Sequence, residues 1–350
     1  MAKENKSKAG RIFLIVVLLL LAGGGWFVWD YVFKGNVNLN GEKYKYLYVH
    51  NNSDYEELKK SLIDDNLIKN VETFDFYARK MKLNENIHAG RYRIVDGMSN
   101  RQLVKMIKNG KEEKVKLAIN YTTRTKQQLI EKLSSKFDMD ANALTEFLEN
   151  EMDLEKNFGM NATSIMTIVR PGEYELSWAT SIEQFFELMK DKYKTFWTDA
   201  RKKKAKEMNF SQSEIIILAS VVQGEASIES EQKKIAGVYI NRLSKDIMLQ
   251  ADPTVIFALN DFTIQRVLSN QLKFDSPYNT YMYKGLPPGP ICFPTEQAIA
   301  AVLNYEKSDN LFFCAKPALN GYSDFSETLE QHEKFAKAYR DEMTRRGIKK

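Results

Sequence analysis

The chain is poor in the residues that bind metals and form disulfide frameworks: its 350 residues include only two cysteines and three histidines. Two cysteines make neither a disulfide framework nor a zinc site, and the motif H-E-x-x-H does not occur. We therefore predict no metal site and no cofactor. Cys292 and Cys314 both stand in apolar sequence surroundings, so we interpret them as buried thiols. A single disulfide is the alternative if this part of the chain lies outside the cytosol.

The chain also has little excess charge of either sign. The 51 Lys and Arg residues and 46 Asp and Glu residues give a net charge of +5. This excess is too small for a nucleic-acid-binding surface, so we expect no nucleic acid among the partners. The 43% hydrophobic and 28% charged residues are typical of a globular protein and exclude a disordered or collagen-like chain. The length is enough for one large domain or two to three smaller ones.

One long hydrophobic run is present, near the N-terminus. Residues 12–29, IFLIVVLLLLAGGGWFVW, carry no charge, and with the residues up to 33 they are long enough to cross a membrane. The run is preceded by four basic residues, which are Lys3, Lys6, Lys8 and Arg11. The positive-inside rule then predicts a cytoplasmic tail at 1–11, a transmembrane helix at 12–33 and an extracytoplasmic remainder. A cleaved signal peptide is the rival interpretation, because LAGGG partly matches a cleavage site.

A repeated local pattern follows a short linker at 34–42. Alternating apolar residues give way to helical spacing three times. The three helices in this pattern begin near Ser53, Ser99 and Thr125. A further helix is expected at about 71–82. Together these elements predict a small α+β module at 43–116.

The rest of the chain predicts one larger domain at 117–345. Up to residue 210 the pattern is mostly helical, with a break at 167–181, where Pro171 and Gly172 prevent a continuous helix. The sharpest local patterns lie in the core of this domain, at 211–345. The expected fold class is therefore α+β: an N-terminal transmembrane helix, a small module and a larger mixed domain.

An acidic residue ends a strongly apolar helix in this core. Ser211 and Glu214 fit a capping box that begins the helix. The apolar stripe that follows consists of Ile215, Leu218, Ala219 and Val222. Continuing the stripe places Glu225 on the same face, and burial of a carboxyl raises its pKa, as a general acid requires. The alternative is that the stripe ends at Glu225 because the helix emerges into solvent.

Further patterns surround this carboxylate in the sequence. Residues 231–243 form an amphipathic helix, and Asp252 followed by Pro253 fits a helix start with Asp252 as N-cap. Residues 276–295 combine tyrosines and prolines with small polar side chains, a mixture that suits a sugar, because rings stack on it and amides bond its hydroxyls. A rigid connecting loop is the alternative interpretation of that segment.

Five motifs in this order resemble the MltG (YceG-like) endolytic murein transglycosylases. They are ASVVQGEAS, VYINRL, LQADPTVIFAL, SPYNTY and GLPPGPI. PGEYELSWATS and DFSETLEQH resemble two further family segments, and the anchor and first module match as well. The resemblance implies a LysM-like module at 43–116 and a transglycosylase domain at 117–345.

The resemblance also implies that Glu225 is the catalytic residue, acting first as acid and then as base on the bond after N-acetylmuramic acid. The sugar's own C6 hydroxyl then closes a 1,6-anhydro ring. Neutral side chains are expected to orient the muramyl unit, and they are Asn241, Gln250, Thr254, Tyr278, Asn279 and Thr280. Asp252 is interpreted as a structural N-cap and as the best candidate for a second carboxylate at the substrate site.

The chain departs from the family pattern at four positions. Glu is common in the family where this chain has Gln223, Lys or Arg where it has Gly224, Thr where it has Glu173, and His where it has Ser323. We interpret an acid at position 223 as dispensable. A basic residue missing at position 224 is expected to alter the charge at the site.

Three other functions remain open at this point. A hydrolytic muramidase would use Glu225 and Asp252 as its two carboxylates, and a glycan-binding scaffold would use neither. A penicillin-binding fold is suggested by SEQK at 230–233, but no K-T-G follows. The resemblance implies that the partners are nascent peptidoglycan strands and peptidoglycan synthases. It also implies that the protein is anchored in a bacterial cytoplasmic (inner) membrane and acts on its outer side.

Overall fold

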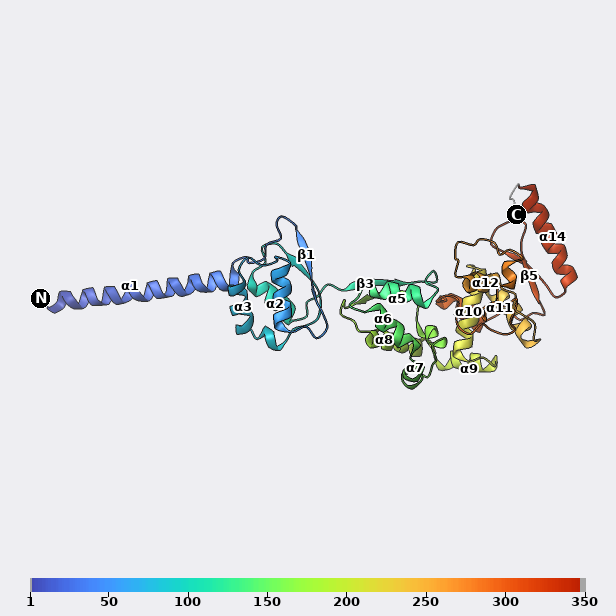
Figure 1. The fold of residues 1–350 in the computed structure, drawn as a ribbon, viewed down its shortest axis with the longest axis horizontal. Coiled ribbons are helices and arrows are strands. Elements are labelled where there is room, and N and C mark those ends of the chain that lie inside the picture. Colours follow the sequence, from blue (N-terminus) through green and yellow to red (C-terminus); the bar gives the residue numbers. More distant parts are fainter. Residues whose placement is uncertain (1, 347–350) are drawn as a thin grey trace. The chain divides into compact units, whose positions relative to one another are not determined.

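The computed structural model describes residues 2–346, with side chains from residue 10 onward. The secondary structure is mixed α and β, as the sequence predicts, with three two-stranded sheets among the described residues (Figure 1). The chain divides into two compact units. The first consists of the residues up to Lys116 together with 136–138 and 175–180, and the second holds the others.

The N-terminal helix is long and apolar enough to cross a membrane. Helix α1 covers Ala2–Val28 and continues into a π-helical turn, η1, at Trp29–Phe33. The apolar stretch Gly10–Phe33 has 24 residues, and none of its apolar window is buried in the protein. This is compatible with the expected single-pass anchor. The side chains of Lys3, Lys6 and Lys8 lie outside the described residues, so the orientation of the anchor stays a prediction.

The first unit is built on an antiparallel strand pair. Strand β1 pairs with β2 so that Tyr44 faces Val95 and Val49 faces Gly90. The elements of this unit are β1 (Tyr44–Val49), α2 (Tyr55–Asp64), α3 (Val71–Lys80), η2 (Leu83–Glu85), β2 (Gly90–Val95) and α4 (Asn100–Lys108). Helices α2, α3 and α4 bury apolar side chains in one core with the strands. The helix expected at 71–82 is therefore confirmed as α3.

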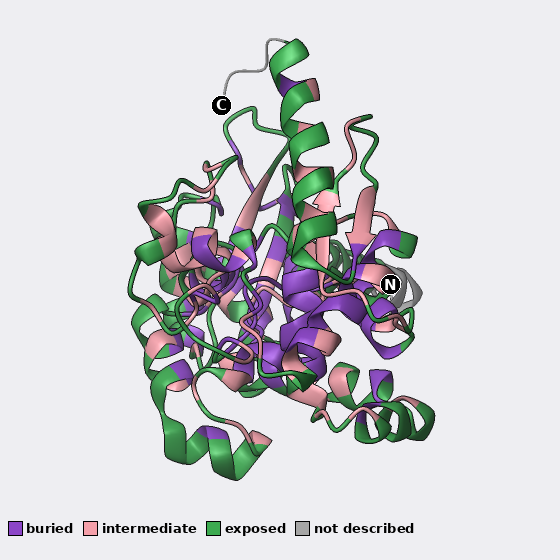
Figure 2. Cartoon of the chain, turned by 90° about the vertical axis from the view of Figure 1, so that its right-hand side faces the viewer, coloured by how far each residue is buried: buried purple, intermediate pink, exposed green. Residues whose placement is uncertain are grey.

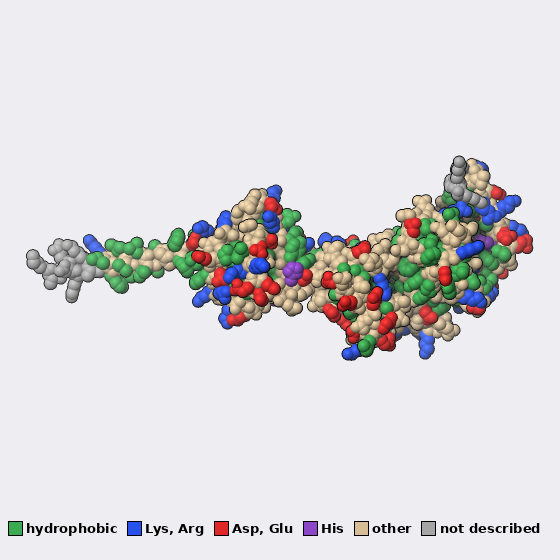
Figure 3. All heavy atoms as spheres, in the orientation of Figure 1, with side chains coloured by type: hydrophobic (Ala, Val, Ile, Leu, Met, Phe, Trp, Pro, Cys, Tyr) green, Lys and Arg blue, Asp and Glu red, His purple; other side chains and the backbone are tan. Residues whose placement is uncertain are grey.

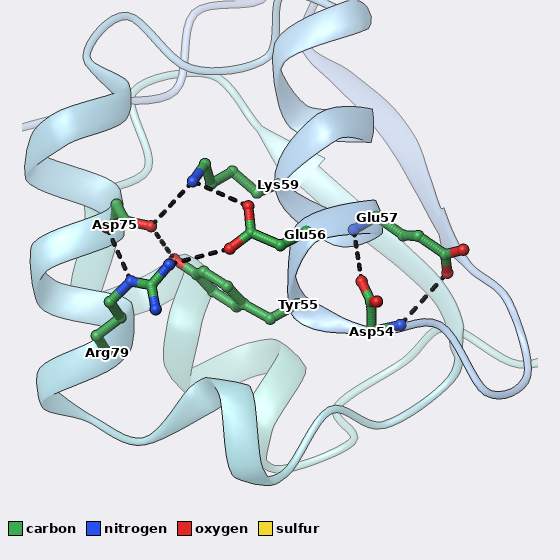
Figure 4. Close-up of polar contacts among 7 residues, drawn as sticks. All are labelled: Asp54, Tyr55, Glu56, Glu57, Lys59, Asp75 and Arg79. Atoms are coloured by element: carbon green, nitrogen blue, oxygen red, sulfur yellow. Dashed lines mark hydrogen bonds and ion pairs between the residues drawn. The ribbon is translucent and has the colours of Figure 1, made fainter.

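The helix starts in the repeated pattern agree with the sequence to within one residue. Ser99 and Thr125 are the N-caps of α4 and α5, as predicted. Helix α2 begins one residue later than expected, because its N-cap is Asp54 and not Ser53. The carboxylate of Asp54 accepts from the Glu57 amide at 2.8 Å, and Glu57 accepts from the Asp54 amide in return (Figure 4).

Figure 4 also shows how α2 is held to α3. The Asp75 carboxylate on α3 accepts hydrogen bonds from Lys59 and Tyr55 on α2 and from Arg79 on its own helix. Arg79 in turn bonds Glu56 on α2 at 2.9 Å. The contacts of Lys59 and Tyr55 with Asp75 are part-buried. Those of Arg79 are exposed, and exposed ion pairs add little to stability.

The second unit is mostly helical. Strands β3 and β4 form one pair, and β5 and β6 form another, antiparallel one. The elements from β3 onward are β3 (Val115–Ile119), α5 (Lys126–Ser134), α6 (Ala141–Glu149), α7 (Glu151–Phe158), η3 (Ser164–Ile168), β4 (Gly172–Leu176), α8 (Ile182–Phe196), α9 (Asp199–Glu207), α10 (Gln212–Glu225), α11 (Glu229–Ser244), α12 (Asp252–Leu259), η4 (Gln271–Lys273), α13 (Glu296–Leu303), β5 (Phe312–Ala315), β6 (Ser323–Ser326) and α14 (Leu329–Arg345). The predicted break at 167–181 contains β4.

Helix α10 is the centre of this unit. Ser211 and Glu214 form the predicted capping box. The four predicted stripe residues are buried, but so are the four residues between them, which are Ile216, Ile217, Ser220 and Val221. The predicted stripe is therefore confirmed as buried, but the buried surface of α10 is wider than the stripe, because the helix packs against α11, α12 and α13 among others. Figure 2 shows buried helical segments in the middle of the view.

The structure also decides two minor points from the sequence. Cys292 and Cys314 are both free, so the disulfide alternative is not realised, and of the two only Cys292 is buried. Ser230 of the S-x-x-K match is exposed, and Lys233 forms a 2.6 Å ion pair with Glu229. This serine therefore has the surroundings of a surface residue.

Candidate active site

Glu225 is the last residue of α10, where the buried helix meets a cavity. The helix ends there because Ala226 is extended, with φ −149° and ψ 151°. The cavity has a volume of about 330 Å³. It is lined by Glu225, Arg242, Leu249, Gln250, Asp252, Tyr281, Phe312, Phe313, Leu329 and His332. The α10 helix therefore presents its terminal carboxylate to a pocket of mixed polar and aromatic side chains.

The surroundings of Glu225 favour its protonated form. Glu225 is half-buried at the edge of the cavity, and this burial raises the pKa of its carboxyl from 4.5 to about 7. The Tyr239 hydroxyl donates a 2.7 Å hydrogen bond to Oε1, which lowers the pKa, and the charge of Asp252 raises it. The partial negative charge at the C-terminal end of α10 also disfavours an ionised carboxylate there. The carboxyl can thus hold a proton near neutral pH.

Asp252 lies in the same cavity, but not as the predicted N-cap. The N-cap of α12 is Ala251, and Asp252 is the first helical residue. Two threonines hold the helix start instead: Thr254 donates to the Ala251 carbonyl at 2.6 Å, and Thr280 accepts from the Ala251 amide at 3.0 Å. The Asp252 carboxylate is therefore available to accept a 2.7 Å hydrogen bond from the Tyr281 hydroxyl.

Three predicted sugar-binding residues are buried behind the cavity wall. Thr254, Asn279 and Thr280 are at most 1% exposed. The Thr254 and Thr280 hydroxyls are 2.8 Å apart, and the Asn279 amide donates to the Leu272 and Phe274 carbonyls. Their polar atoms already bond the protein: Thr280 fixes the 276–295 loop against α12, and Asn279 holds the same loop to the segment before it. Contact of these three residues with a substrate stays a prediction.

The remaining predicted residues are spread around the site. Gln250 lines the cavity, and its Oε1 accepts from Arg242 at 3.1 Å. Asn241 is turned to a neighbouring loop, where its amide donates to the Ser308 and Asn310 carbonyls. The Tyr278 ring packs against Phe257 at a centroid distance of 4.7 Å. The structure thus brings Glu225, Gln250 and Asp252 together in one cavity and leaves the other five outside its lining.

Reasoning from the sequence missed four polar residues of this site, which are Tyr239, Arg242, Tyr281 and His332. Tyr239 and Arg242 are the second and fifth residues of the VYINRL motif, which belongs to α11 beside α10, so the motif itself was the available signal. Tyr281 stands three residues after the tyrosine that the sequence favoured. No periodicity in the sequence indicates which of the two reaches the cavity.

Arg242 and His332 shape the cavity in different ways. The largely buried Arg242 guanidinium donates to the carbonyls of Leu311, Met248 and Leu249 and so ties three chain segments together. The His332 ring stacks on Phe312 at 5.4 Å, and its Nδ1 has no partner among the described residues. Burial, and next the charge of Arg242, lower the pKa of His332. The ring is therefore neutral near neutral pH.

Three of the four departures from the family pattern have local structural partners. The Gln223 Oε1 accepts from the Thr295 hydroxyl at 2.7 Å and so holds the start of α13, away from the cavity. Gly224 packs against Pro253, and a Cβ at position 224 would lie only 2.6 Å from the Pro253 Cβ. A larger residue there requires a shift of α12. Glu173 lies outside the cavity lining, and the Ser323 amide donates to buried Glu231 at 2.7 Å.

No group of three or more His, Cys, Asp or Glu side chains within the described part of the chain is arranged to hold a metal ion. The polar side chains that line the cavity are two carboxyl groups, the Tyr281 hydroxyl, the Gln250 amide, the Arg242 guanidinium and the His332 ring. A carboxyl that keeps its proton near neutral pH can donate it to a leaving oxygen.

Comparisons with known proteins identify similar chains over nearly the full length. A family model described as the YceG-like family matches residues 47–338. A Streptococcus pneumoniae R6 protein named endolytic murein transglycosylase is 27% identical over 360 residues, which cover 93% of this chain and 64% of the relative. A Bacillus subtilis 168 protein of the same name is 28% identical over 325 residues, which cover 87% of this chain and 85% of the relative. The chain thus spans just under two thirds of the streptococcal relative.

A crystal structure of a yceG-like protein from Listeria monocytogenes has a similar fold. Its TM-score to this chain is 0.56 at 26% sequence identity, and the match covers 83% of this chain and 98% of that one.

Proposed function

Because the chain belongs to the YceG-like family, we propose that it is a peptidoglycan lytic transglycosylase with Glu225 as its catalytic acid. One observation carries the proposal: the carboxyl of Glu225 lies in a 330 Å³ cavity whose surroundings raise its pKa to about 7. Support also comes from the similar proteins of Streptococcus pneumoniae and Bacillus subtilis, which are named endolytic murein transglycosylases. The proposed substrate is the glycan strand, cut within its length.

The proposed reaction needs one carboxyl group and no water. Glu225 donates its proton to the glycosidic oxygen that follows N-acetylmuramic acid, and the bond from that oxygen to the anomeric carbon breaks. The resulting carboxylate accepts the proton of the C6 hydroxyl of the same sugar. The C6 oxygen then bonds the anomeric carbon and closes a 1,6-anhydro ring. The nucleophile belongs to the substrate, so proximity replaces an activated water.

We assign supporting roles to the groups around Glu225. The Tyr239 hydroxyl, 2.7 Å from Oε1, stabilises the carboxylate that forms after the proton has left. The negative charge of the Asp252 carboxylate stabilises the positive charge that develops at the anomeric carbon. The Gln250 side chain binds sugar hydroxyls. Asn241, Thr254, Tyr278, Asn279 and Thr280 act indirectly in this proposal, because their contacts hold the loops that form the cavity.

A hydrolytic muramidase is the second candidate, favoured by the presence of Asp252 and Glu225 in one cavity. Two carboxyl groups on either side of a glycosidic bond are the usual equipment of a glycoside hydrolase. In that case Asp252 would be the nucleophile or the base, and the products would carry reducing ends and no anhydro rings.

The parts of the chain are assigned as follows. Residues 12–33 anchor the protein in a cytoplasmic membrane, the LysM-like module at 43–116 stands outside, and residues 117–345 carry the reaction. We further propose that the enzyme acts beside peptidoglycan synthases on nascent strands, because its anchor keeps it at the membrane where such strands are made. A pull-down from cross-linked membranes that recovers no synthase would contradict this partnership.

The proposed function is tested by analysing products. Purified full-length protein in detergent is incubated with uncross-linked glycan strands, beside Glu225→Gln and Glu155→Gln, and the fragments are identified by mass spectrometry. Glu155 is an exposed carboxylate on α7, outside the cavity lining, and serves as the matched control. We expect anhydromuramyl ends from the wild type and from Glu155→Gln, and none from Glu225→Gln.

Two other outcomes would contradict the proposal in different ways. Reducing ends in place of anhydro ends would assign the protein to the hydrolases, with Asp252 the next residue to replace. Equal cleavage by Glu225→Gln and the wild type would remove Glu225 from the chemistry altogether.

A further inference from the structure

A second cavity lies in the first unit, where the apolar helix ends. Its volume is about 580 Å³. One wall is the last part of the helix, with Val28, Val32 and Phe33, and the opposite wall carries Arg101, Lys105 and Lys108 of α4. The cavity therefore combines an apolar side and a cationic side at the point where the chain leaves the span Gly10–Phe33.

The three cations share one face of α4 and lack ionic partners. Positions 101, 105 and 108 follow the i, i+4, i+7 spacing of one helical face. No carboxylate of the described residues pairs with any of them, and none lines the cavity. Arg101 is the second residue of α4, where the helix dipole disfavours a positive charge. The helix dipole thus favours Lys105 and Lys108 in the last turn, whereas it disfavours Arg101 in the first turn.

The side chains of the apolar wall are exposed, whereas a water-soluble protein would bury such side chains. Val28 is 47% exposed and Phe33 44% exposed, and Met81 beside them is 40% exposed. Figure 3 shows apolar side chains along the N-terminal helix and charged ones on the compact part that follows it. An apolar surface of this kind marks contact with a partner or a membrane.

The position of the cavity along the helix indicates what fills it. A hydrocarbon core about 30 Å thick takes roughly 20 residues at 1.5 Å each. Counted from Arg11, the last charged residue before the run, such a span ends near Tyr31. Val32 and Phe33 then lie at the level of the lipid headgroups, and so do the cations across the cavity.

The walls of this cavity are held together by specific contacts. The Asn100 amide, next to Arg101, donates to the Tyr31 carbonyl at 2.9 Å. The Phe76 ring of α3 packs edge-on against Phe27 and Tyr31 at 5.6 and 5.3 Å. Arg101 lies 5.3 Å from the centre of the Phe33 ring. The cationic wall is therefore fixed to the end of the membrane helix.

We propose that this cavity binds the headgroup of an anionic phospholipid in the leaflet from which the chain emerges. Arg101, Lys105 and Lys108 hold the phosphate, and Val28, Val32 and Phe33 contact the adjoining glycerol and upper acyl chain. The bound lipid sets the height of residues 34–116 above the bilayer. The proposal rests on the helix crossing a membrane and is independent of the reaction proposed for the second unit.

The test measures lipid retention by the full-length protein. Native mass spectrometry is carried out on protein in detergent, titrated with phosphatidylglycerol or with zwitterionic phosphatidylcholine. The variant replaces Arg101, Lys105 and Lys108 by Gln. The control replaces three lysines of α9 by Gln, namely Lys202, Lys203 and Lys206, which are exposed and lie in the second unit. Arg101→Lys, which keeps the charge, is a second control.

We expect the wild type to retain phosphatidylglycerol in preference to phosphatidylcholine, and the triple variant to bind it about a hundredfold more weakly. This factor follows from a contribution of roughly fivefold from each of the three cations near an anionic surface. The α9 control and Arg101→Lys should bind like the wild type. Equal retention of both lipids, or equal retention by the α4 variant and the α9 control, would overturn the proposal.

A separate arm distinguishes a lipid from a free anion. Millimolar inorganic phosphate is added to the complex with phosphatidylglycerol. Retention that persists supports a headgroup site with an acyl contact. Complete displacement of the lipid would show a site for free phosphate and would overturn the assignment to the membrane.

Discussion

Replacing Glu225 by Gln should make the protein more stable at alkaline pH, although it removes the proposed catalytic group. The carboxyl of Glu225 has a pKa of about 7 in the folded protein and an ordinary value of 4.5. Between these values the folded state binds more protons than the unfolded state, so the free energy of unfolding falls as the pH rises. Below pH 4.5 the carboxyl is protonated in both states and this cost is absent.

The size of the effect follows from the shift. One pKa unit corresponds to about 1.4 kcal/mol, so a change from 4.5 to about 7 costs the folded protein about 3 kcal/mol above pH 7. Gln is a neutral isostere of the protonated acid and can still accept the hydrogen bond from Tyr239. We therefore expect Glu225→Gln to exceed the wild type by about 3 kcal/mol at pH 8 and to equal it at pH 4.5.

Urea unfolding of the full-length protein in detergent at both pH values measures this difference. Trp197, which is 1% exposed and belongs to the same core cluster as α10, reports on the second unit by its fluorescence. Glu155→Gln, at an exposed site, should show no comparable change between the two pH values. A stability difference that does not depend on pH, or a Glu225→Gln protein less stable than the wild type at pH 8, would refute the reasoning.

Three further predictions concern the neighbours of Glu225. Tyr239→Phe removes a hydrogen bond to the carboxylate worth about 1.5–3 kcal/mol, so the alkaline limb of the pH profile of kcat/KM should move up by roughly one to two units; an unchanged limb would contradict this. Asp252→Asn removes a charge that raises the pKa of Glu225, so the alkaline limb of the same pH profile should move down. The value of kcat should fall by about tenfold or less. A loss of roughly 10²–10⁴-fold would instead indicate an obligatory second carboxylate. Gly224→Ala should lower the free energy of unfolding by about 1–3 kcal/mol, measured in urea, because the new Cβ meets Pro253; a fully stable variant would show that α12 moves freely.

The parts of the fold that could be predicted depend on contacts between neighbours in the sequence. Ser99, Thr125 and Ser211 are N-caps because a hydroxyl reaches an amide three residues later, and such a bond needs no information from the rest of the chain. Glu225 could be placed at the C-terminal end of α10 because the spacing of apolar residues along a helix is also a local property of the sequence. The family motifs then indicated its role.

The parts that could not be predicted depend on contacts between distant segments. Asp252 is of a residue type that favours the N-cap position. Thr280, 28 positions away, accepts the hydrogen bond of the Ala251 amide instead, and the Asp252 carboxylate bonds Tyr281. The burial of four further residues of α10 could not be predicted from the apolar stripe. A helix that is packed on all sides has no polar face, so its sequence shows no helical period of polar and apolar residues. His332 reaches the cavity from α14, more than 100 residues after Glu225.

The central claim is that Glu225 holds a proton near neutral pH so that it can act as the acid. Its protonation can be followed directly in full-length protein labelled with ¹³C at the Glu side-chain carboxyl, by comparing carbon NMR spectra of the wild type and Glu225→Gln across pH 4 to 9. The signal missing from the variant should titrate at about pH 7. A missing signal that titrates near 4.5, as for an exposed glutamate, would contradict the account.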